Sequence, residues 1–565
     1  MPTLSFRPNN WPAVGHRLSR SERVLAQFTN TSMKKLLLCG TLALAACTGS
    51  IEGPRPDGTG GPLDPQAGPP VYAPAGIRRL SQAEVLTAAT ALVGLPADEL
   101  ATAVGADIRQ AGFTRNSDQR VGSDQAQALW QAAQHYAHDA VTQRLSTLAP
   151  CSTPSGSEAC AGDFITRFAG RAFRRAVTAE EKAALLTVYR AGLVGANYAS
   201  GIELVITAVL QSASFLYVTE LGAPAASGVT TLSGEELATQ LAFLFTGAPA
   251  DDALMAAGRA GQLADPEVRA STARALLATP AGKQQVERMI LEWQGSDEVA
   301  AAPKDVMLFP AWTSVRADML QESRSIIDAV LFQGDGTLQS LLSTPQTTVT
   351  PALASFYELT GTGPITQPAF RKGLLLAGAF SASHAHPSTT APVKRGNIVR
   401  RKLLCQELTI PTIVAGVTIM VPAPDPTKTT RERFEVHSLN PNCAGCHRLL
   451  DPIGFALENF DAVGRYRTME NGKPIDPSGE LVGAGDADGA FTDAVGMVEL
   501  LAKSKSVEQC FERQLYRFVT GRSGTEEERT LGDFFRGRPS SANGQVLELL
   551  VDYARSDVFA KRSAP

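Results

Sequence analysis

The apolar residues of this chain recur mainly at helical spacing. Between 233 and 245, four of them fall at positions i, i+4, i+7 and i+8, the stripe by which a helix buries one face: Leu237, Leu241, Leu244 and Phe245. A second stripe lies near the end of the chain, where Gly521 follows as a typical C-terminal cap: Phe511, Leu515, Phe518 and Val519. The pattern predicts a mainly α fold of several packed helical domains.

Helix start signals support this prediction. Three Ser/Thr-x-x-Glu sequences fit the capping box, in which two side chains satisfy two backbone N–H groups: Ser81 with Glu84, Thr178 with Glu181, and Ser233 with Glu236. Segments 79–100 and 231–254 also share Leu-Ser-x-x-Glu followed by Gly-x-Pro-Ala-Asp. Either a common helical plan or convergence of start and stop signals explains this echo.

One region breaks the helical pattern. Residues 366–484 are less regular, rich in Pro and Gly, and include Asn471-Gly472, a signal for a short hairpin. A chain of 565 residues is too long for one hydrophobic core. We expect helical domains at 76–147, 148–225 and 229–360, a loop-rich domain at 366–484 and a C-terminal helical domain at 485–565.

The N-terminal region reads as an export signal. From Met33 the chain runs "MKKLLLCGTLALAAC", two lysines and eleven mostly apolar residues, too few for a bilayer, which needs about 20. The end of the run resembles the lipobox of bacterial lipoproteins, in which Cys47 is lipid-attached, and Thr48 after it favours the outer membrane. We therefore expect an upstream extension from a misassigned start at 1–32, a signal peptide at 33–46 and a Gly/Pro tether at 47–75.

Composition narrows the class of protein. With 44% hydrophobic and 19% charged residues the chain is an ordinary globular protein, and its net charge of −4 argues against a nucleic-acid partner. The short basic runs at 173–175 and 399–402 are expected to be solvated helix faces. The expected partners are a membrane, through the lipid anchor, and an unidentified redox protein.

Eight cysteines occur, and export would place them in an oxidising compartment. Cleavage removes Cys39 and acylation uses Cys47. Four of the remaining six are disulfide candidates, with a local pair and a distant pair as the favoured connectivity: Cys151 with Cys160, and Cys405 with Cys510.

The last two cysteines belong to "NCAGCH", in which Cys443, Cys446 and His447 have the spacing of covalent haem c attachment. Two thiols add to the porphyrin vinyl groups, and the adjacent imidazole can bind the iron from the same side. A disulfide between these cysteines is one alternative. Zinc is another, bound by both cysteines and two of the four nearby histidines: His384, His386, His437 and His447.

A haem used for electron transfer usually has a second axial ligand, which the sequence does not name. Met469 and Met497 lie downstream of the motif, where a thioether could return to the iron. His437 or His386 would instead complete a bis-histidine site of lower potential. All four stay candidates on sequence alone.

Three quoted stretches carry a family resemblance: "AHPSTTAPVKRGNIVRRKLLC", "NPNCAGCHRLLDPIGFALENFDAVGRYR" and "CFERQLYRFVTGR". They resemble multi-domain proteins of unknown function from planctomycetes and myxobacteria, whose planctomycete members are associated with cytochrome c domains. The resemblance implies an exported, haem-bearing surface protein and says almost nothing about its substrate. A second C-x-x-C-H is missing from the chain, which puts a multi-haem relay in doubt.

Two functional hypotheses follow. The first is a lipid-anchored, mono-haem c-type cytochrome-like protein that transfers electrons or forms the redox part of an oxidoreductase. The second is a cell-surface binding or scaffold lipoprotein with a structural zinc or disulfide at the same motif. Whether the chain is an enzyme is left open by both.

Overall fold

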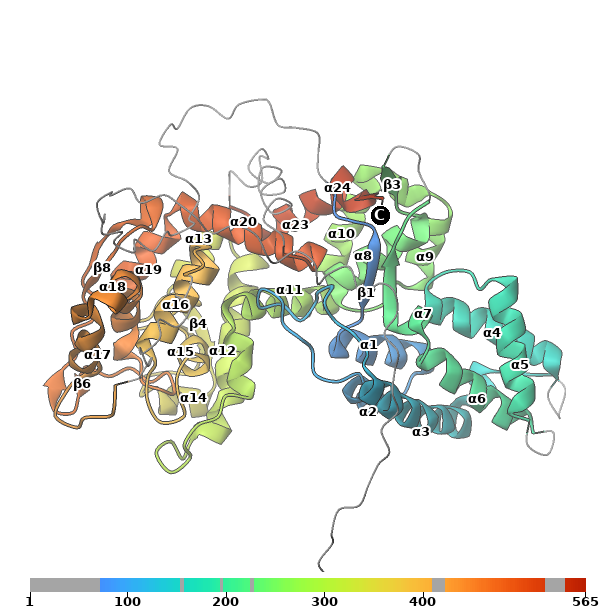
Figure 1. The fold of residues 1–565 in the computed structure, drawn as a ribbon, viewed down its shortest axis with the longest axis horizontal. Helices are drawn as coiled ribbons and strands as arrows, with labels where there is room; N and C mark the ends of the chain where they lie inside the picture. Colours follow the sequence, from blue (N-terminus) through green and yellow to red (C-terminus); the bar gives the residue numbers. More distant parts are fainter. Residues whose placement is uncertain are drawn as a thin grey trace, which may run out of the picture. The chain divides into compact units, whose positions relative to one another are not determined.

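Helices make up most of the fold, as the apolar periodicity predicts, and the strands are short (Figure 1). The computed structural model describes residues 72–152, 157–193, 197–223, 228–408, 422–523 and 544–564. The expected signal peptide, Cys47 and the tether lie outside these ranges. Among the described residues, no helix is both long enough and apolar enough to span a bilayer.

The first described segments form a helical group closed by a two-stranded sheet. Strand β1 pairs antiparallel with β2 over Gly76–Arg79 and Tyr217–Glu220, so residues about 140 positions apart lie side by side. The elements in order are β1 (Gly76–Arg79), α1 (Gln82–Val93), α2 (Asp98–Ala103), α3 (Ser123–Leu148), α4 (Glu158–Phe173), α5 (Ala179–Ala191), α6 (Tyr198–Leu210), α7 (Ala213–Leu216) and β2 (Tyr217–Glu220).

The next segment is a second helical group. Its elements are β3 (Val229–Thr231), α8 (Gly234–Thr246), α9 (Asp252–Arg259), η1 (Gln262–Ala264), α10 (Pro266–Leu277), α11 (Pro280–Gln294), η2 (Ser296–Ala300), α12 (Trp312–Leu331), α13 (Leu338–Ser343), β4 (Gln346–Val349) and α14 (Pro351–Phe356). All four residues of the predicted stripe on α8 are buried. Residues 237–245 are all buried, so α8 packs on every side and not along this stripe alone.

The loop-rich region combines helices with two two-stranded ribbons, β6–β7 and β8–β9, and its first strand, β5, pairs with β4 of the preceding segment. It contains β5 (Gly363–Thr366), α15 (Gly378–Ser383), α16 (Pro392–Leu403), α17 (Thr430–Leu439), α18 (Pro441–Ala456), η3 (Leu457–Asn459), β6 (Met469–Glu470), β7 (Lys473–Pro474), β8 (Gly479–Leu481), η4 (Gly485–Ala487) and β9 (Gly489–Phe491). The predicted hairpin is present: β6 pairs with β7 across Asn471 and Gly472, both with positive φ, as a tight primed turn requires.

The C-terminal elements are α19 (Ala494–Ala502), α20 (Lys505–Thr520), α23 (Val546–Arg555), α24 (Asp557–Ala560) and β10 (Lys561–Ser563). Strand β10 pairs with β3, more than 330 residues earlier. Gly521 ends α20 in the left-handed region and donates its N–H to Arg517, as predicted. The four apolar residues predicted to line α20 are buried in the largest hydrophobic core.

The predicted caps are confirmed. Capping boxes begin α1, α5 and α8 at Ser81, Thr178 and Ser233. Helices α1 and α8 also end alike, at Gly94 and Gly247 in the left-handed conformation, so the echo in the sequence corresponds to two helices with the same start and stop.

Two disulfides confirm the favoured connectivity of the cysteines. Cys151 bonds to Cys160 at the start of α4, and Cys405 after α16 bonds to Cys510 in α20. The second bond links segments 105 residues apart. It ties the region of the C-x-x-C-H motif to the C-terminal helix.

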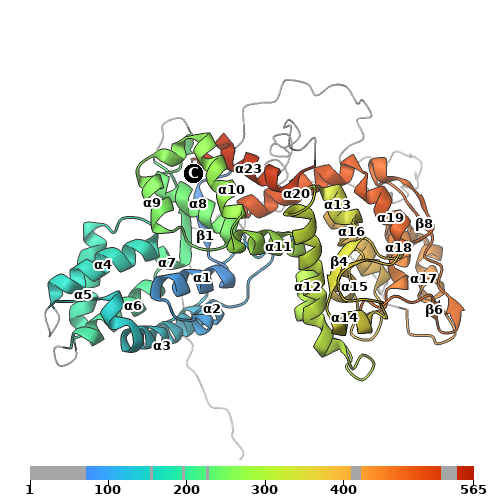
Figure 2. The ribbon, with the colours of Figure 1, turned by 180° about the vertical axis from the view of Figure 1, so that it is seen from behind.

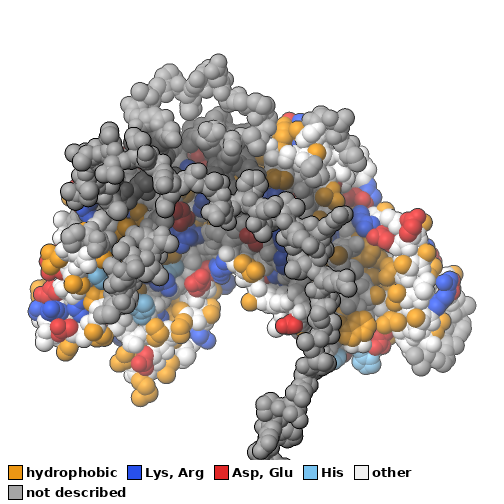
Figure 3. Space-filling view, viewed as in Figure 1, with side chains coloured by type: hydrophobic (Ala, Val, Ile, Leu, Met, Phe, Trp, Pro, Cys, Tyr) orange, Lys and Arg blue, Asp and Glu red, His pale blue; other side chains and the backbone are white. Residues whose placement is uncertain are grey.

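The expectation of solvated basic runs is wrong for several residues. Arg174 is buried and donates to the carbonyls of Ser214, Phe215 and Tyr217. Arg400 is fully buried and Lys402 is 8% exposed. A guanidinium can saturate several carbonyls that end a helix or line a loop, which charge counting along a sequence does not detect. On the face in Figure 3, basic and acidic side chains are interspersed.

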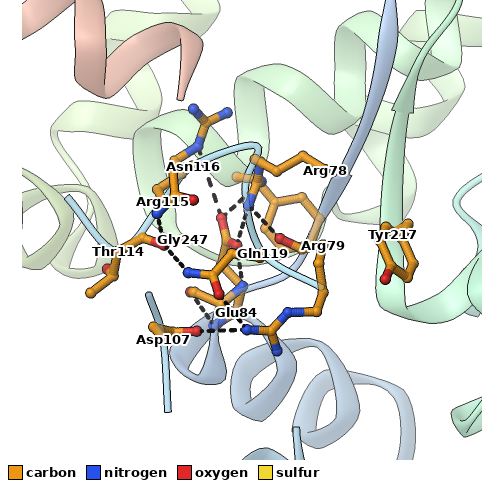
Figure 4. A network of polar contacts seen from close by, with 12 residues as sticks. Arg78, Arg79, Glu84, Asp107, Thr114, Arg115, Asn116, Gln119, Tyr217 and Gly247 are labelled. Atoms are coloured by element: carbon orange, nitrogen blue, oxygen red, sulfur yellow. Dashed lines mark hydrogen bonds and ion pairs between the residues drawn. The ribbon is translucent and has the colours of Figure 1, made fainter. Parts of the chain in front are cut away.

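A buried polar network joins the first helical group to later segments (Figure 4). Glu84 is fully buried and accepts two hydrogen bonds from Arg78, at 2.6 and 3.0 Å. Arg115 lies 3.9 Å from the same carboxylate and donates to the carbonyls of Phe518 and Val519 in α20. Burial alone raises the pKa of Glu84, but its two arginine neighbours outweigh burial and lower that pKa to about 2.

Candidate functional site

The C-x-x-C-H motif lies in the first turns of α18. The backbone N–H groups of Cys443 and Ala444 both donate to the carbonyl of Asn440, which begins the helix. Cys443, Cys446 and His447 therefore occupy positions i, i+3 and i+4, which share one helix face. Both thiols are free and partly exposed, and every other cysteine in the described residues is in a disulfide.

His447 is oriented by a carboxylate one turn further along α18. Its Nδ1 lies 2.9 Å from Oδ1 of Asp451, whose side chain is 3% exposed. A carboxylate only accepts hydrogen bonds, so Nδ1 carries the proton and Nε2 of the neutral ring has its lone pair available. The other carboxylate oxygen, Oδ2, is buried and has no hydrogen-bond partner among the described residues. A metal-binding histidine typically has this kind of carboxylate support.

A second histidine meets this ring from α17, which lies beside α18 in both views (Figures 1 and 2). The ring centroids of His437 and His447 are 4.4 Å apart with a 45° tilt, and Phe434 packs edge-on against His437. Of the four candidates for a sixth ligand, His437 has a ring in contact with that of His447.

The other three candidates lie in different settings. Met497 is fully buried in the core on α19. Met469, in β6, is 50% exposed and lines a cavity. His386 is exposed in a turn after α15, where its backbone N–H donates to Thr389. Their roles stay predictions.

His384, a candidate zinc ligand, is a core histidine. Its Nε2 lies 2.7 Å from the carbonyl oxygen of Gln294, and the residue is 2% exposed. Burial lowers the pKa of this ring to about 3. Throughout the described ranges, no group of three or more His, Cys, Asp or Glu side chains has the geometry to hold a metal ion. The tetrahedral site that structural zinc requires is therefore not preformed there.

Helix α18 lies against α16 at backbone contact, and one glycine on each helix makes this approach feasible. A Cβ on Gly396 would collide with the carbonyl of Leu450, and a Cβ on Gly454 with that of Pro392. Both glycines belong to the stretches that carry the family resemblance. They fix the position of the helix that presents the motif.

Two fully buried arginines of α16 hold the chain that follows the motif. Arg395 donates to four carbonyls within 3.0 Å, those of Ser381, Leu457, Phe460 and Asp461. Arg400 donates to the carbonyls of Leu449 and Val482. Charge counting along the sequence did not single out these residues; Arg395 directly precedes Gly396, and Arg400 follows it by about one helical turn.

The apolar and acidic residues after the motif serve the fold. Leu457 and Phe460 are fully buried in the protein core, and Phe455 lies under the guanidinium of Arg431 at 4.7 Å from its ring centre. Asp461 accepts from the N–H groups of Val463 and Arg465 and from Nε of Arg465. Asp461 and Arg465 thus fix the loop that contains them.

Three segments are similar to families described only as proteins of unknown function. Residues 160–220 match PSD5 (DUF1595), 232–359 match PSD4 (DUF1592) and 371–470 match PSCyt3 (DUF1588). The third match contains the whole C-x-x-C-H motif. No curated protein and no solved structure matches the chain. The chain therefore has three domains of unknown function, and each match falls within one of the predicted domains, whose boundaries stay predictions.

Proposed function

We propose that this chain is an exported, lipid-anchored, mono-haem c-type cytochrome-like protein, used for electron transfer or as the redox part of an oxidoreductase. One observation carries the proposal. The two free thiols of the described residues and the carboxylate-supported His447 share one face of a single helix.

The residues fit covalent haem by three criteria. Both thiols are unpaired and reachable, so each can form a thioether. The proton of His447 is held at Nδ1 by Asp451, which leaves Nε2 free for a metal. The buried, unpartnered Oδ2 of Asp451 adds negative potential next to the ring, which favours a positive charge there. Bound haem would supply one-electron redox chemistry.

The protein's own residues would attach the haem, orient its histidine ligand and support the helix that carries both. Cys443 and Cys446 would form the two covalent links, and His447 would be the proximal ligand. Asp451 orients the imidazole, while Gly396 and Gly454 let α16 support α18 from behind. His437 packs on the ring of His447 and would help to hold that ring in place.

The lipid anchor and the outer-membrane location belong to the same proposal. They are supported by the sequence "MKKLLLCGTLALAAC" and by the two disulfides, which suit an oxidising compartment. The rival, a surface binding or scaffold lipoprotein, needs Cys443 and Cys446 to hold zinc or to form a disulfide.

One experiment separates these functions. The chain is expressed in a host with haem c maturation, run on a denaturing gel with peroxidase-based haem staining, and examined by reduced absorption spectroscopy. We expect a stained band that is lost when Cys443→Ala and Cys446→Ala are combined. The matched control, Cys405→Ala with Cys510→Ala, removes a disulfide and should keep the stain. A colourless wild-type protein with one equivalent of zinc would contradict the proposal.

A further inference from the structure

A cavity of about 570 Å³ lies beside the motif-bearing region without including the motif itself. Its walls come from the residues before α12, the end of α14, the turn after α15, the start of α17 and the loop before β6. Cys443, Cys446 and His447 are not among its lining residues. The volume is within the usual range for small-molecule sites.

The walls are held rigidly from behind. Arg371 is 1% exposed, stacks 4.0 Å from the ring centre of Tyr357, and donates to the carbonyl of Gly464. Tyr357 in turn donates to the buried carboxylate of Glu322 at 2.9 Å. These contacts connect the two sides of the cavity through buried groups, so the cavity is preformed.

Aromatic surface lines one part of the cavity. The guanidinium of Arg465 lies 5.5 Å from the ring centre of Phe356 and 6.0 Å from that of Phe309. Tyr466 also lines it and is stacked on Phe370, at 3.8 Å between ring centroids. Each of these rings has one face covered by its neighbour and contributes the rest of its apolar surface to the lining.

The lining also contains hydrogen-bond donors and acceptors. Only Nε of Arg465 is hydrogen-bonded among the described residues, so both terminal nitrogens remain available. The hydroxyls of Ser388 and Thr389 make no hydrogen bond there either. Glu358 is exposed at the rim with no ion pair in the described chain, and Oδ2 of Asp425 makes no hydrogen bond there.

The charge balance of the lining selects a ligand class. Three arginines face four carboxylates: Arg433, Arg465 and Arg467, with Glu358, Asp425, Asp461 and Glu470. A polyanion would be repelled by the carboxylates, and a polycation would be repelled by the arginines, so a ligand of neither charge is favoured. A ligand with many hydroxyls can donate to carboxylates, accept from guanidiniums and place its C–H face on an aromatic ring.

We infer that this cavity binds a neutral, polyhydroxylated ligand of the oligosaccharide class. The inference does not require the proposed haem, because the lining contains none of the motif residues and Met469 is the one sixth-ligand candidate in it. Binding is measured on the protein with or without haem, so failure of one proposal leaves the other standing.

The test is isothermal titration calorimetry of the purified full chain with four neutral probes: cellotetraose, xylotetraose, mannotetraose and fully N-acetylated chitotetraose. We expect at least one to bind with a Kd below about 1 mM. Arg465→Gln and Phe356→Ala should each weaken that binding about tenfold. Arg190→Gln is the matched control, because Arg190 is also exposed and paired with one carboxylate but lies on α5, and it should leave binding unchanged.

A second variant guards against misfolding, since Arg465 also supports its loop through Asp461. Ser388→Ala removes an exposed hydroxyl without a structural partner and should weaken binding about threefold. The inference is overturned if none of the four probes binds. It is also overturned if chondroitin sulfate or an acidic peptide binds in their place, or if Arg190→Gln weakens binding as much as Arg465→Gln does.

Discussion

The imidazole rings of His437 and His447, from two different helices, lie in direct contact with their centroids 4.4 Å apart. Two imidazoles on opposite sides of one metal ion would have centroids roughly 6 Å apart, because each metal–nitrogen bond is about 2 Å long. His437 and His447 are thus too close to bind one iron from opposite sides without a shift of α17.

This contact predicts different results for the two histidines. His447→Ala should remove most of the attached haem, because His447 is the proposed proximal ligand and directly follows Cys446. His437→Ala should keep the haem stain and the position of the reduced α-band. Gel staining and reduced spectra of the two variants check this prediction. A spectral shift in His437→Ala would show that α17 moves and that His437 binds the iron.

The glycine contact between α16 and α18 predicts that Gly454→Ala destabilises the protein by about 1–3 kcal/mol, because its Cβ would collide with the carbonyl of Pro392. Gly445 is the matched control within the same helix: it is exposed, and a Cβ there would have no neighbour within 4 Å. Gly445→Ala should be neutral or slightly stabilising. Thermal unfolding of both variants measures this difference in stability. If Gly454→Ala and Gly445→Ala lost equal stability, Gly454 would not be needed for the close approach of the two helices.

The buried carboxylate of Glu84 predicts acid sensitivity (Figure 4). Its pKa is about 2 in the folded protein and near 4.5 in the unfolded chain, so the unfolded chain binds the proton more readily. The stabilisation is complete above about pH 4.5 and is lost as the pH falls towards 2, by about 3 kcal/mol in total. Glu84→Gln should abolish this contribution and destabilise the protein at pH 7, because the buried Arg78 and Arg115 lose a carboxylate partner.

Urea unfolding at pH 7 and pH 3.5 measures this effect. Glu99→Gln is the control, since the side chain of Glu99 is 63% exposed. If Glu84→Gln were as stable as Glu99→Gln at pH 7, the network would have no net stabilising role.

The core histidine His384 predicts that stability also depends on pH in a higher range than for Glu84. Its pKa is lowered to about 3 by burial, whereas an unfolded histidine has a pKa near 6.5. As the pH falls, His384 therefore takes up a proton in the unfolded chain before it does so in the folded protein. The stability present above pH 6.5 decreases as the pH drops towards 3, by at most about 5 kcal/mol. His384→Gln keeps an N–H for the Gln294 carbonyl and lacks a titrating ring, so its stability should depend less on pH between 7 and 4.

The control for this measurement is His135→Gln, because the side chain of His135 is 69% exposed. Denaturant unfolding at several pH values should show that the stability of the control variant depends on pH as that of the wild type does. An unchanged dependence in His384→Gln would mean that this ring can take up a proton without unfolding.

Local features were predictable from the sequence. The capping boxes at Ser81, Thr178 and Ser233, the hairpin at Asn471-Gly472 and the Cys151–Cys160 pair all involve residues fewer than ten positions apart. Backbone dihedral preferences and hydrogen bonds within one or two turns determine such features. The shared face of Cys443, Cys446 and His447 follows from helical periodicity in the same way.

Long-range contacts needed the tertiary structure. The sequence listed Met469, Met497, His386 and His437 as equals, and only the packing of α17 on α18 brings His437 to the motif. The basic run at 399–402 read as solvated because charge along a sequence does not reveal which carbonyls need donors, and Arg400 is buried for that reason. The cavity likewise arises from segments about 160 residues apart, whose side chains meet only once the helical core has packed.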